Sequence, residues 1–317
     1  MNSEPSGHAR PCPVCGSSRV VAVGPILHPR PALVAGLPID LGDDAYALAQ
    51  CAVCGFAFKN PRIPESELLR CYAKASSDHW EERPDPIARS WDTLKHTVEQ
   101  YAPGHAVLDV GCFNGALLAY LGAGWDRFGV EPSASAAQMA RSRGVNVLGA
   151  TIDDIPRELC FDVIMAIDVV EHIAEPLPFF RAVARHLRPR GAFIVQTGDL
   201  DAWTWRLEGS RYWYCSLPEH VSFYSRGAMM ELAARTGMTS VGHVRMSHAR
   251  QSALTRASEL LKNAGYVVGQ RLGGFGVPAL RRLFVDRRAP GWLTANDHML
   301  HIMTRDVESD PGGSRAS

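Results

Sequence analysis

The sequence predicts an α/β protein in which helices cover a mostly parallel sheet, preceded by a small zinc-binding ribbon. Two observations lead to this prediction. From Ala106 onward, short apolar runs alternate with helical stretches, and this alternation is typical of βαβ units. Before that point, two Cys-x-x-Cys-Gly motifs stand 35 residues apart. The 317 residues are enough for one large domain and one small domain.

Composition excludes several classes of protein. With 46% hydrophobic and 21% charged residues, the chain is neither disordered nor fibrous. Its 33 basic residues balance 33 acidic ones, so it lacks the overall positive field that binders of duplex nucleic acid usually carry. The polar first ten residues do not resemble a secretory signal, and no apolar run is long enough for a transmembrane helix. We therefore expect a cytoplasmic protein.

The paired cysteines predict a structural metal site. Cys12 and Cys15 form the first motif, and Cys51 and Cys54 form the second. Two residues between thiolates allow both sulfurs to face one tetrahedral Zn²⁺, and four thiolates leave no open position for catalysis. The alternative is four unrelated thiols. The other cysteines have no such spacing, and we interpret them as free, mostly buried thiols: Cys71, Cys112, Cys160 and Cys215.

Further elements follow in order along the chain. A short strand at 56–61 closes the ribbon, and apolar spacing predicts helices at 65–72 and 87–101 that connect it to the sheet, either roofing a pocket or only packing. The expected core strands are Val107–Val110, Arg127–Val130, Val145–Leu148, Phe161–Ile167 and Ala192–Gln196, with a last antiparallel strand at His298–Thr304. The expected divisions are a zinc ribbon at 1–60, a helical linker or cap at 61–104, the core at 105–248, a basic helical insertion at 249–290, the final core strand at 291–306 and a disordered tail at 307–317.

The first loop of the core has the character of a ligand-binding turn. Gly111 and Gly115 allow a sharp turn before a helix, and Asp109 suits a positively charged ligand. Phe113 stands where a pyrophosphate-binding fingerprint has its middle glycine, which weakens an interpretation as an NAD site. Glu131 ends the next strand, at a distance along the chain that suits hydrogen bonds to a ribose diol.

These residues resemble the class I S-adenosylmethionine-dependent methyltransferases, and the resemblance runs from about Trp91 to Arg305. It covers the first loop, Glu131, the segment 152–154, the segment 165–173 and the turn and strand at 187–197. The resemblance implies a Rossmann-like, mostly parallel seven-stranded sheet and S-adenosylmethionine as the cofactor. The residues that it implies for the cofactor site are Asp109, Gly111, Cys112, Phe113, Gly115, Glu131, Asp153 and Asp168.

Some of these positions have simpler explanations. Asp168 could cap the helix that follows it. Glu171 and His172 could pair with each other within the first turn, and a structural role is the favoured interpretation of His172.

Aromatic residues and an acid/base pair follow the fifth strand. Three tryptophans lie within eleven residues at 203–213, and the stretch 203–224 predicts either an acceptor-binding wall or a hydrophobic cluster under a long loop. Glu219 and His220 precede a helix that Ser225 opens. Because histidine titrates near neutrality and a carboxylate can orient it, we predict His220 as the general base and Glu219 as its partner.

The segment 249–290 carries eight basic residues and two acidic ones. Leu254, Leu261 and Ala264 predict one amphipathic helix, and Leu280, Leu283 and Phe284 predict another beyond Gly273 and Gly274. Such helices can lie on a membrane or attract a phosphorylated substrate, but a solvated insertion is the favoured interpretation.

Three functions compete. A zinc ribbon joined to this domain, with a Glu-His pair, is similar to bacterial methyltransferases of sugar and natural-product pathways, including nucleotide-sugar C-methyltransferases. The leading prediction is therefore methyl transfer to a small biosynthetic acceptor, with nucleotide sugars and glycans among the candidates. An RNA base methyltransferase is the second, although the ribbon has few basic residues. A non-catalytic module that binds a nucleoside and recruits a partner is the third.

Overall fold

The computed structural model describes residues 10–42, 46–75, 88–247, 253–274, 289–291 and 296–306. The expected tail at 307–317 and the second expected helix of the basic insertion lie outside these ranges.

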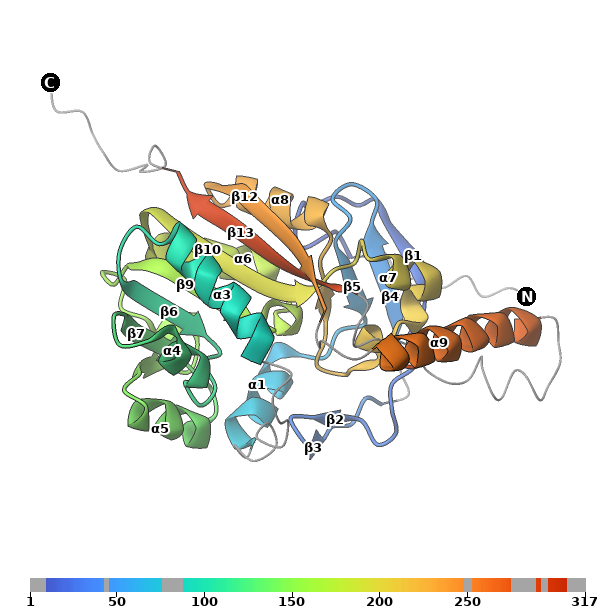
Figure 1. Ribbon diagram of the computed structural model, residues 1–317. Coiled ribbons are helices and arrows are strands. Elements are labelled where there is room, and N and C mark those ends of the chain that lie inside the picture. The colour runs from blue at the N-terminus through green and yellow to red at the C-terminus, as the bar shows by residue number, and fades with distance from the viewer. Residues whose placement is uncertain are drawn as a thin grey trace, which may run out of the picture.

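The central sheet has seven strands in the order β12-β13-β10-β9-β6-β7-β8 (Figure 1). These strands are β6 (Ala106–Val110), β7 (Asp126–Val130), β8 (Asn146–Gly149), β9 (Phe161–Ile167), β10 (Leu187–Gly198), β12 (Met238–Met246) and β13 (His298–Arg305). The strands from β10 to β8 run parallel, and β13 is antiparallel to both of its neighbours. The predicted Rossmann-like, mostly parallel seven-stranded sheet is confirmed.

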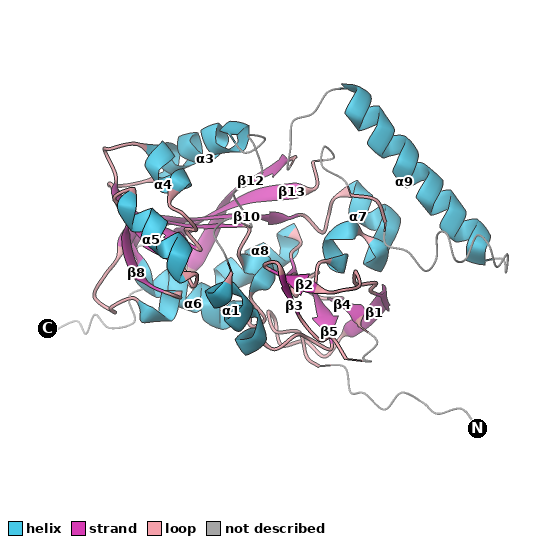
Figure 2. Ribbon diagram, turned by 90° about the horizontal axis from the view of Figure 1, so that it is seen from below, coloured by secondary structure: helices cyan, strands magenta, loops and turns pink. Residues whose placement is uncertain are grey.

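Helices cover both faces of this sheet. The α-helices are α1 (Glu65–Lys74), α3 (Ala88–Tyr101), α4 (Ala116–Leu121), α5 (Ala134–Ser142), α6 (Pro176–His186), α7 (Trp203–Glu208), α8 (Arg226–Arg235) and α9 (Ala253–Gly274). Short 3₁₀ turns are η1 (Ile152–Asp154), η2 (Val170–His172), η3 (Gly209–Arg211) and η4 (Trp213–Ser216). Figure 2 shows α3 and α4 on one face and α6 and α8 on the other.

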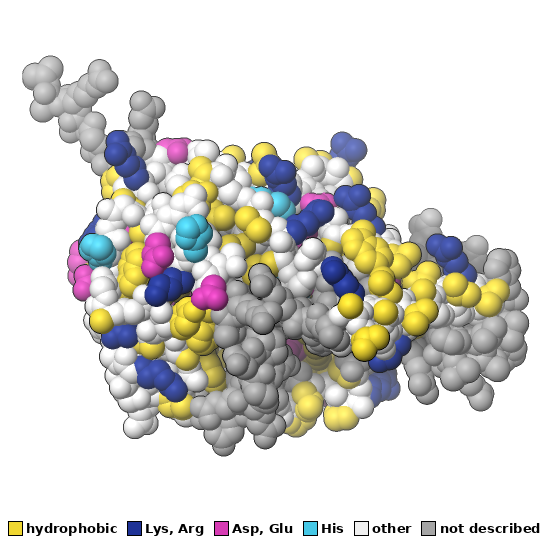
Figure 3. All heavy atoms as spheres, in the orientation of Figure 1, with side chains coloured by type: hydrophobic (Ala, Val, Ile, Leu, Met, Phe, Trp, Pro, Cys, Tyr) yellow, Lys and Arg dark blue, Asp and Glu magenta, His cyan; other side chains and the backbone are white. Residues whose placement is uncertain are grey.

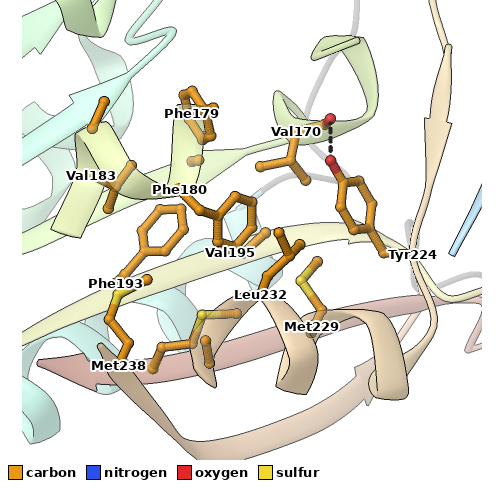
Figure 4. Close-up of a cluster of buried hydrophobic side chains, with 14 of the residues drawn as sticks. Val170, Phe179, Phe180, Val183, Phe193, Val195, Tyr224, Met229, Leu232 and Met238 are labelled. Atoms are coloured by element: carbon orange, nitrogen blue, oxygen red, sulfur yellow. Dashed lines mark hydrogen bonds between the residues drawn. The ribbon is translucent and has the colours of Figure 1, made fainter. Parts of the chain in front are cut away.

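The face under α6 and α8 holds a dense aromatic and aliphatic core. Phe180 of α6 packs edge-on against Phe193 of β10, with ring centroids 5.3 Å apart (Figure 4). Met229 and Leu232 of α8 are completely buried in the same cluster. The Tyr224 hydroxyl donates a hydrogen bond of 2.8 Å to the carbonyl oxygen of Val170, so the polar end of this buried ring has its partner. This core fixes η2 relative to the segment that precedes α8.

The N-terminal ribbon is built into the core domain. Its strands β1 (Val20–Pro25), β4 (Ala47–Cys51) and β5 (Ala57–Asn60) form an antiparallel sheet whose fourth strand is β11 (Ser222–Phe223), contributed by the core. The connection between β1 and β4 carries the small hairpin of β2 (Leu33–Val34) and β3 (Leu37–Pro38). The segment just after His220 therefore pairs directly with the ribbon.

Several details differ from the sequence expectations. The turn expected at 187–191 lies inside β10, where the register against β9 shifts between Leu187 and Ala192. β12 was not among the expected strands, because most of its residues are not buried and it lacks an apolar run. The predicted helix of the basic insertion is α9, which continues through Gly273. Within the described residues, no helix combines the length and apolar character needed to cross a membrane.

Candidate active site

The candidate site lies at the carboxyl edge of the sheet, where the chain order reverses between β6 and β9. From β6 the chain continues to β7 and β8 on one side, and it then returns to β9 and β10 on the other. In open α/β sheets, ligands bind at this switch point because the flanking loops diverge there. The loops after β6, β7 and β9 carry the predicted cofactor residues.

The loop after β6 turns through left-handed backbone conformations. Gly111 and Gly115 both have φ of +74°, and Phe113 has φ of +45° between them. A side chain at Gly115 would meet Val145 and Ala140 at about 3 Å, so helix α4 begins in close contact with α5. Phe113 adopts the positive φ that glycine would supply, at a steric cost that the surrounding contacts must offset.

Glu131 stabilises this loop through its carboxylate. One oxygen accepts a hydrogen bond of 2.9 Å from the Phe113 amide, and the other accepts 2.8 Å from the Ser133 amide. Burial raises the pKa of Glu131, and these two backbone hydrogen bonds oppose the rise. The carboxylate therefore bridges the loop after β6 and the start of α5.

Asp109 lies buried at the end of β6. Burial, and then the charge of Glu131, raise its pKa to about 8. At neutral pH and without a ligand, the neutral form of this carboxyl group predominates. A cationic ligand beside it would favour the ionised form, so the site has the electrostatic character expected for a sulfonium or ammonium group.

The other predicted cofactor residues are distributed around this edge. Cys112 is buried, and its sulfur lies against Gly129, so its side chain packs into the core while its backbone belongs to the loop. Asp153 is exposed in η1, beyond β8. Asp168 follows β9 with φ of +54°, and its carboxylate accepts weak hydrogen bonds of 3.3–3.4 Å from the Gln196 amide.

A buried carboxylate with two hydroxyl partners lies next to Asp168. Glu171 is 1% exposed, and it accepts hydrogen bonds of 2.6 Å from the Tyr214 hydroxyl and 2.8 Å from the Thr197 hydroxyl. Burial, and then the charge of Asp168, raise its pKa to about 7, while the two hydroxyls oppose the rise. The pairing with His172 considered from the sequence is not among the hydrogen bonds and ion pairs that the structure gives for Glu171.

His172 has a partner from the N-terminal part of the chain. Its Nδ1 lies 2.9 Å from the Tyr72 hydroxyl of α1 and 3.1 Å from the carbonyl oxygen of Glu219. Burial lowers the pKa of His172, so the ring is neutral at neutral pH. Tyr72 was only an apolar position of the expected helix at 65–72, and the structure gives its hydroxyl a contact with the site.

His220 is more deeply buried than Glu219, the other predicted catalytic residue. It is 7% exposed, and its ring centroid lies 4.0 Å from that of Tyr214 and 5.0 Å from that of His172. Its Nδ1 is buried and has no hydrogen-bond partner among the described residues. Burial holds its pKa well below the usual range, and the protonated forms of His172, Lys59 and His298 lower it further. His220 is therefore a neutral base at neutral pH. The sequence-based expectation that it titrates near neutrality is wrong, because burial lowers its pKa. The structure gives no hydrogen bond or ion pair between the Glu219 carboxylate and His220.

The same cluster has the ligand types of a cation site. One atom from each of Glu171, His172 and His220 lies within 4.8 Å of the others. However, both oxygens of Glu171 already accept hydroxyl hydrogen bonds.

Lys59 supports this cluster from the ribbon. It is completely buried on β5, and its Nζ donates to the carbonyl oxygens of Leu217 and Pro218, at 2.5 and 3.3 Å, while burial lowers the pKa of Lys59 to about 7. Its backbone amide donates to the carbonyl oxygen of Val221 at 3.1 Å. Lys59 thus binds both sides of the Glu219–His220 dipeptide. In the sequence, Lys59 is only one of the few basic residues of the ribbon.

Most of the aromatic stretch is core and not an acceptor wall. Trp205 stacks on Tyr212 with centroids 4.8 Å apart, and both pack with ribbon residues such as Leu48. Trp203 is exposed at 51%. Tyr214, through Glu171 and His220, is the member of the stretch with direct contacts to the acid/base cluster. The structure favours the hydrophobic-cluster alternative for the others.

The four ribbon cysteines converge. The Sγ atoms of Cys12 and Cys54 lie 3.6 Å apart, those of Cys15 and Cys51 lie 3.5 Å apart, and all four lie within 4.8 Å of one another. Thiolates at about 2.3 Å from a tetrahedral zinc ion would be about 3.8 Å apart. The arrangement of the sulfurs fits Zn²⁺, and the alternative of four unrelated thiols does not explain it.

Comparison with known proteins agrees with this geometry. The sequence model of a family described as "Methyltransferase domain" matches residues 79–243, slightly more than half of the chain. This chain belongs to the S-adenosylmethionine-dependent methyltransferases. The ubiquinone biosynthesis O-methyltransferase of Rickettsia prowazekii is 31% identical to this methyltransferase over 98 residues, covering 29% of it and 39% of the relative. The cyclopropane-fatty-acyl-phospholipid synthase of Escherichia coli is 30% identical over 142 residues, covering 42% and 37%.

The similarity to solved structures concerns the fold. One chain from the complex between the Haloferax volcanii Trm112 methyltransferase activator and a methyltransferase has a TM-score of 0.50 and 18% identity, covering 73% of this methyltransferase and 98% of that chain. This methyltransferase spans about two fifths of the length of the curated relatives above.

Proposed function

We propose that this chain transfers a methyl group from S-adenosylmethionine to a small biosynthetic acceptor whose reacting atom carries a proton, with nucleotide sugars, glycans and other natural-product intermediates as candidates. The observation that carries the proposal is the buried His220 Nδ1, which has no hydrogen-bond partner in the described part of the chain and lies in a cluster with Glu171. A neutral imidazole in this position can accept a proton. The cluster borders Asp168, at the edge of the sheet where the family places its cofactor.

The residues of the cofactor site fit this ligand. Gly111 brings the backbone of the first loop close to a ligand, Glu131 offers a carboxylate for the ribose hydroxyls, and Asp109 and Asp168 would face the cationic end. When bound, the cofactor supplies an electrophilic methyl group on a sulfonium. The contribution of the protein is then to align the acceptor and to remove its proton.

His220 is the residue we assign to proton removal. Because its pKa is held low, the ring is unprotonated over the whole neutral range. After it accepts a proton, the ionised form of Glu171 stabilises the imidazolium by charge, and Tyr214 and Thr197 hold that carboxylate in place. We therefore assign to Glu171 the role of acidic partner of His220, which the sequence suggested for Glu219.

The depth of the cluster supports a small acceptor. Glu171 and His220 are both buried, so an acceptor must bring its reacting atom below the surface. A nucleobase on RNA would have to be extruded to reach this depth, and such enzymes combine a pocket with basic surfaces for the phosphates. We infer in addition that the four ribbon cysteines bind one structural Zn²⁺, because their spacing fits a tetrahedral ion.

The decisive experiment is a transfer assay with S-adenosylmethionine labelled on its methyl group. The acceptor panel contains nucleotide sugars, catechol-type phenols, phospholipid vesicles and bulk tRNA, and His220→Ala serves as the matched inactive variant. Label on a small acceptor that depends on His220 supports the proposal. Label on tRNA alone would replace it by the RNA function. Cofactor binding without any transfer to the panel or to a cell extract would favour a non-catalytic module.

A further inference from the structure

Helix α9 exposes a row of apolar side chains to solvent. Its buried side is mixed: Tyr266 and Val267 pack with Ala289, and Glu259 and Asn263 lie beside them, with the Asn263 side chain donating to the Glu259 carbonyl oxygen at 3.0 Å. On the opposite side, Leu254 and Leu261 are 83% and 75% exposed. A helix at the surface of a water-soluble domain normally keeps its apolar stripe against the core.

The exposed apolar residues form one continuous stripe. Leu254, Leu261 and Val268 are spaced by seven residues, which places them on one side of the helix, and Leu272 extends the row. Val268 is 56% and Leu272 is 47% exposed. From Leu254 to Leu272 the stripe measures about 27 Å at 1.5 Å per residue. A single exposed leucine is ordinary, but a stripe of this length indicates that another apolar phase covers it.

The charges beside the stripe have one sign. Lys262 and Arg271 are exposed at roughly 90° to either side of the stripe, and Arg256 is exposed on the far side of the helix, whereas the acidic residue of α9, Glu259, is buried. The surrounding segment 249–290 carries eight basic residues and two acidic ones. Figure 3 shows yellow apolar side chains along α9 with dark blue Lys and Arg side chains beside them. Such a surface is complementary to an apolar layer that is bordered by negative charge.

We propose that α9 is a peripheral membrane-docking helix, which lies in the surface of a bilayer that contains anionic lipids. Its leucines would enter the acyl boundary, and Lys262 and Arg271, which flank the stripe, would contact the phosphate headgroups. A second copy of this chain is a poorer occupant, because pairing two α9 stripes brings basic residues together with no exposed acid on α9 to match them. In Figure 1, α9 projects away from the central sheet.

The test is co-sedimentation of the full-length protein with vesicles of phosphatidylcholine alone or mixed with phosphatidylglycerol. We expect binding to the mixed vesicles that weakens as salt rises. Leu261→Glu removes apolar burial and adds a repelled charge, so it should weaken binding at least tenfold. The double change Lys262→Glu and Arg271→Glu should have a similar effect. Met230→Glu, at a half-exposed apolar position of α8, is the matched control and should bind like the parent protein.

Each outcome decides the proposal. Binding that requires phosphatidylglycerol and is lost in the α9 variants, but not in Met230→Glu, supports it. No binding to mixed vesicles, or equal loss in Met230→Glu, overturns it. Sedimentation equilibrium adds a second readout: a dimer that Leu261→Glu dissociates would assign the stripe to a second copy instead. Methyl transfer is not part of the readout, so failure of the proposed function leaves this test intact.

Discussion

The Nζ of Lys59 donates a hydrogen bond of 2.5 Å to the carbonyl oxygen of Leu217, across 158 residues of sequence. Lys59 lies on the last strand of the cysteine ribbon, and Leu217 lies three residues before His220. Because the lysine is fully buried and also binds the carbonyl oxygen of Pro218, the ribbon determines the path of the chain that carries the candidate base. The ribbon is therefore part of the active-site scaffold.

The first prediction concerns this link. Lys59→Met keeps the aliphatic part of the side chain but removes the donor to the Pro218 carbonyl oxygen and one of two donors to the Leu217 carbonyl oxygen, which keeps the backbone amide of His220. Each lost partner costs about 1–3 kcal/mol, so the variant should be less stable and should also position His220 poorly. We expect kcat to fall at least tenfold while the dissociation constant of S-adenosylmethionine stays within twofold. Turnover measurements, calorimetry and thermal unfolding check these three quantities.

Lys74→Met, at an exposed position of α1, is the control and should leave all three quantities unchanged. If Lys59→Met loses stability and cofactor affinity together, the lysine supports the fold in general. If kcat is unchanged, the link has no catalytic role.

The sequence predicted the fold and the cofactor edge because local patterns encode both. Alternating apolar runs identify βαβ units, and Glu131 follows the first loop at a characteristic distance along the chain. The contacts of Lys59 and Tyr72 were not predictable in this way. They join residues separated by 158 and 100 positions, and neither residue belongs to a motif. The burial that makes His220 a neutral base also depends on tertiary packing.

The packing of the aromatic stretch at 203–224 was also not predictable from the sequence. A high density of tryptophan and tyrosine indicates burial, but it does not say against which surface. Trp205 and Tyr212 pack with the ribbon because β11 joins the ribbon sheet, a pairing without a sequence signal. The outward-facing stripe of α9 was predicted as an amphipathic helix, whereas its orientation came only from the structure.

The second prediction concerns the metal. The protein should contain one zinc per chain, and a strong chelator or Cys51→Ser should remove it and lower the melting temperature, because metal binding and folding of the ribbon are coupled. Loss of zinc should also lower the rate of methyl transfer, because the ribbon carries Lys59, which binds the chain on both sides of the Glu219–His220 dipeptide. Elemental analysis and thermal unfolding provide the measurements, and Cys160→Ser outside the ribbon is the control. Full zinc content in Cys51→Ser would refute the four-cysteine site.

The third prediction uses the raised pKa of Asp109. If the cofactor binds next to the ionised carboxylate, its affinity should increase as the pH rises toward about 8, because less proton must be displaced. Asp109→Asn should bind more weakly and lose this dependence. Without cofactor, the raised pKa means that this group stabilises the fold most at low pH and loses that contribution as the pH rises through 8. Calorimetry at several pH values measures the first effect, and equal slopes in both proteins would contradict it.

The fourth prediction concerns Glu131. Glu131→Ala removes the carboxylate assigned to the ribose and also frees the amides of Phe113 and Ser133. A charge-assisted hydrogen bond contributes roughly 1.5–3 kcal/mol, so S-adenosylmethionine should bind at least about tenfold more weakly. Glu158→Ala, at an exposed site before β9, should bind normally. Unchanged affinity in Glu131→Ala, or a preference for NAD in the parent protein, would remove the assignment.

The fifth prediction separates the roles of His220 and Glu171 by pH. Because His220 is already neutral at pH 7, it causes no loss of rate until the medium becomes clearly acidic. Glu171, with a pKa of about 7, ionises within the neutral range, and its negative charge stabilises the imidazolium that forms during proton removal. The rate should therefore rise with pH through about 7. Glu171→Gln should flatten this rise, and His220→Ala should lower kcat by about 10²–10⁴, with cofactor affinity nearly unchanged in both. Initial rates from pH 5.5 to 9 test this, with His172→Ala alongside. If His172→Ala is inactive while His220→Ala is active, the base is His172, and if both are active, alignment of the acceptor is sufficient for transfer.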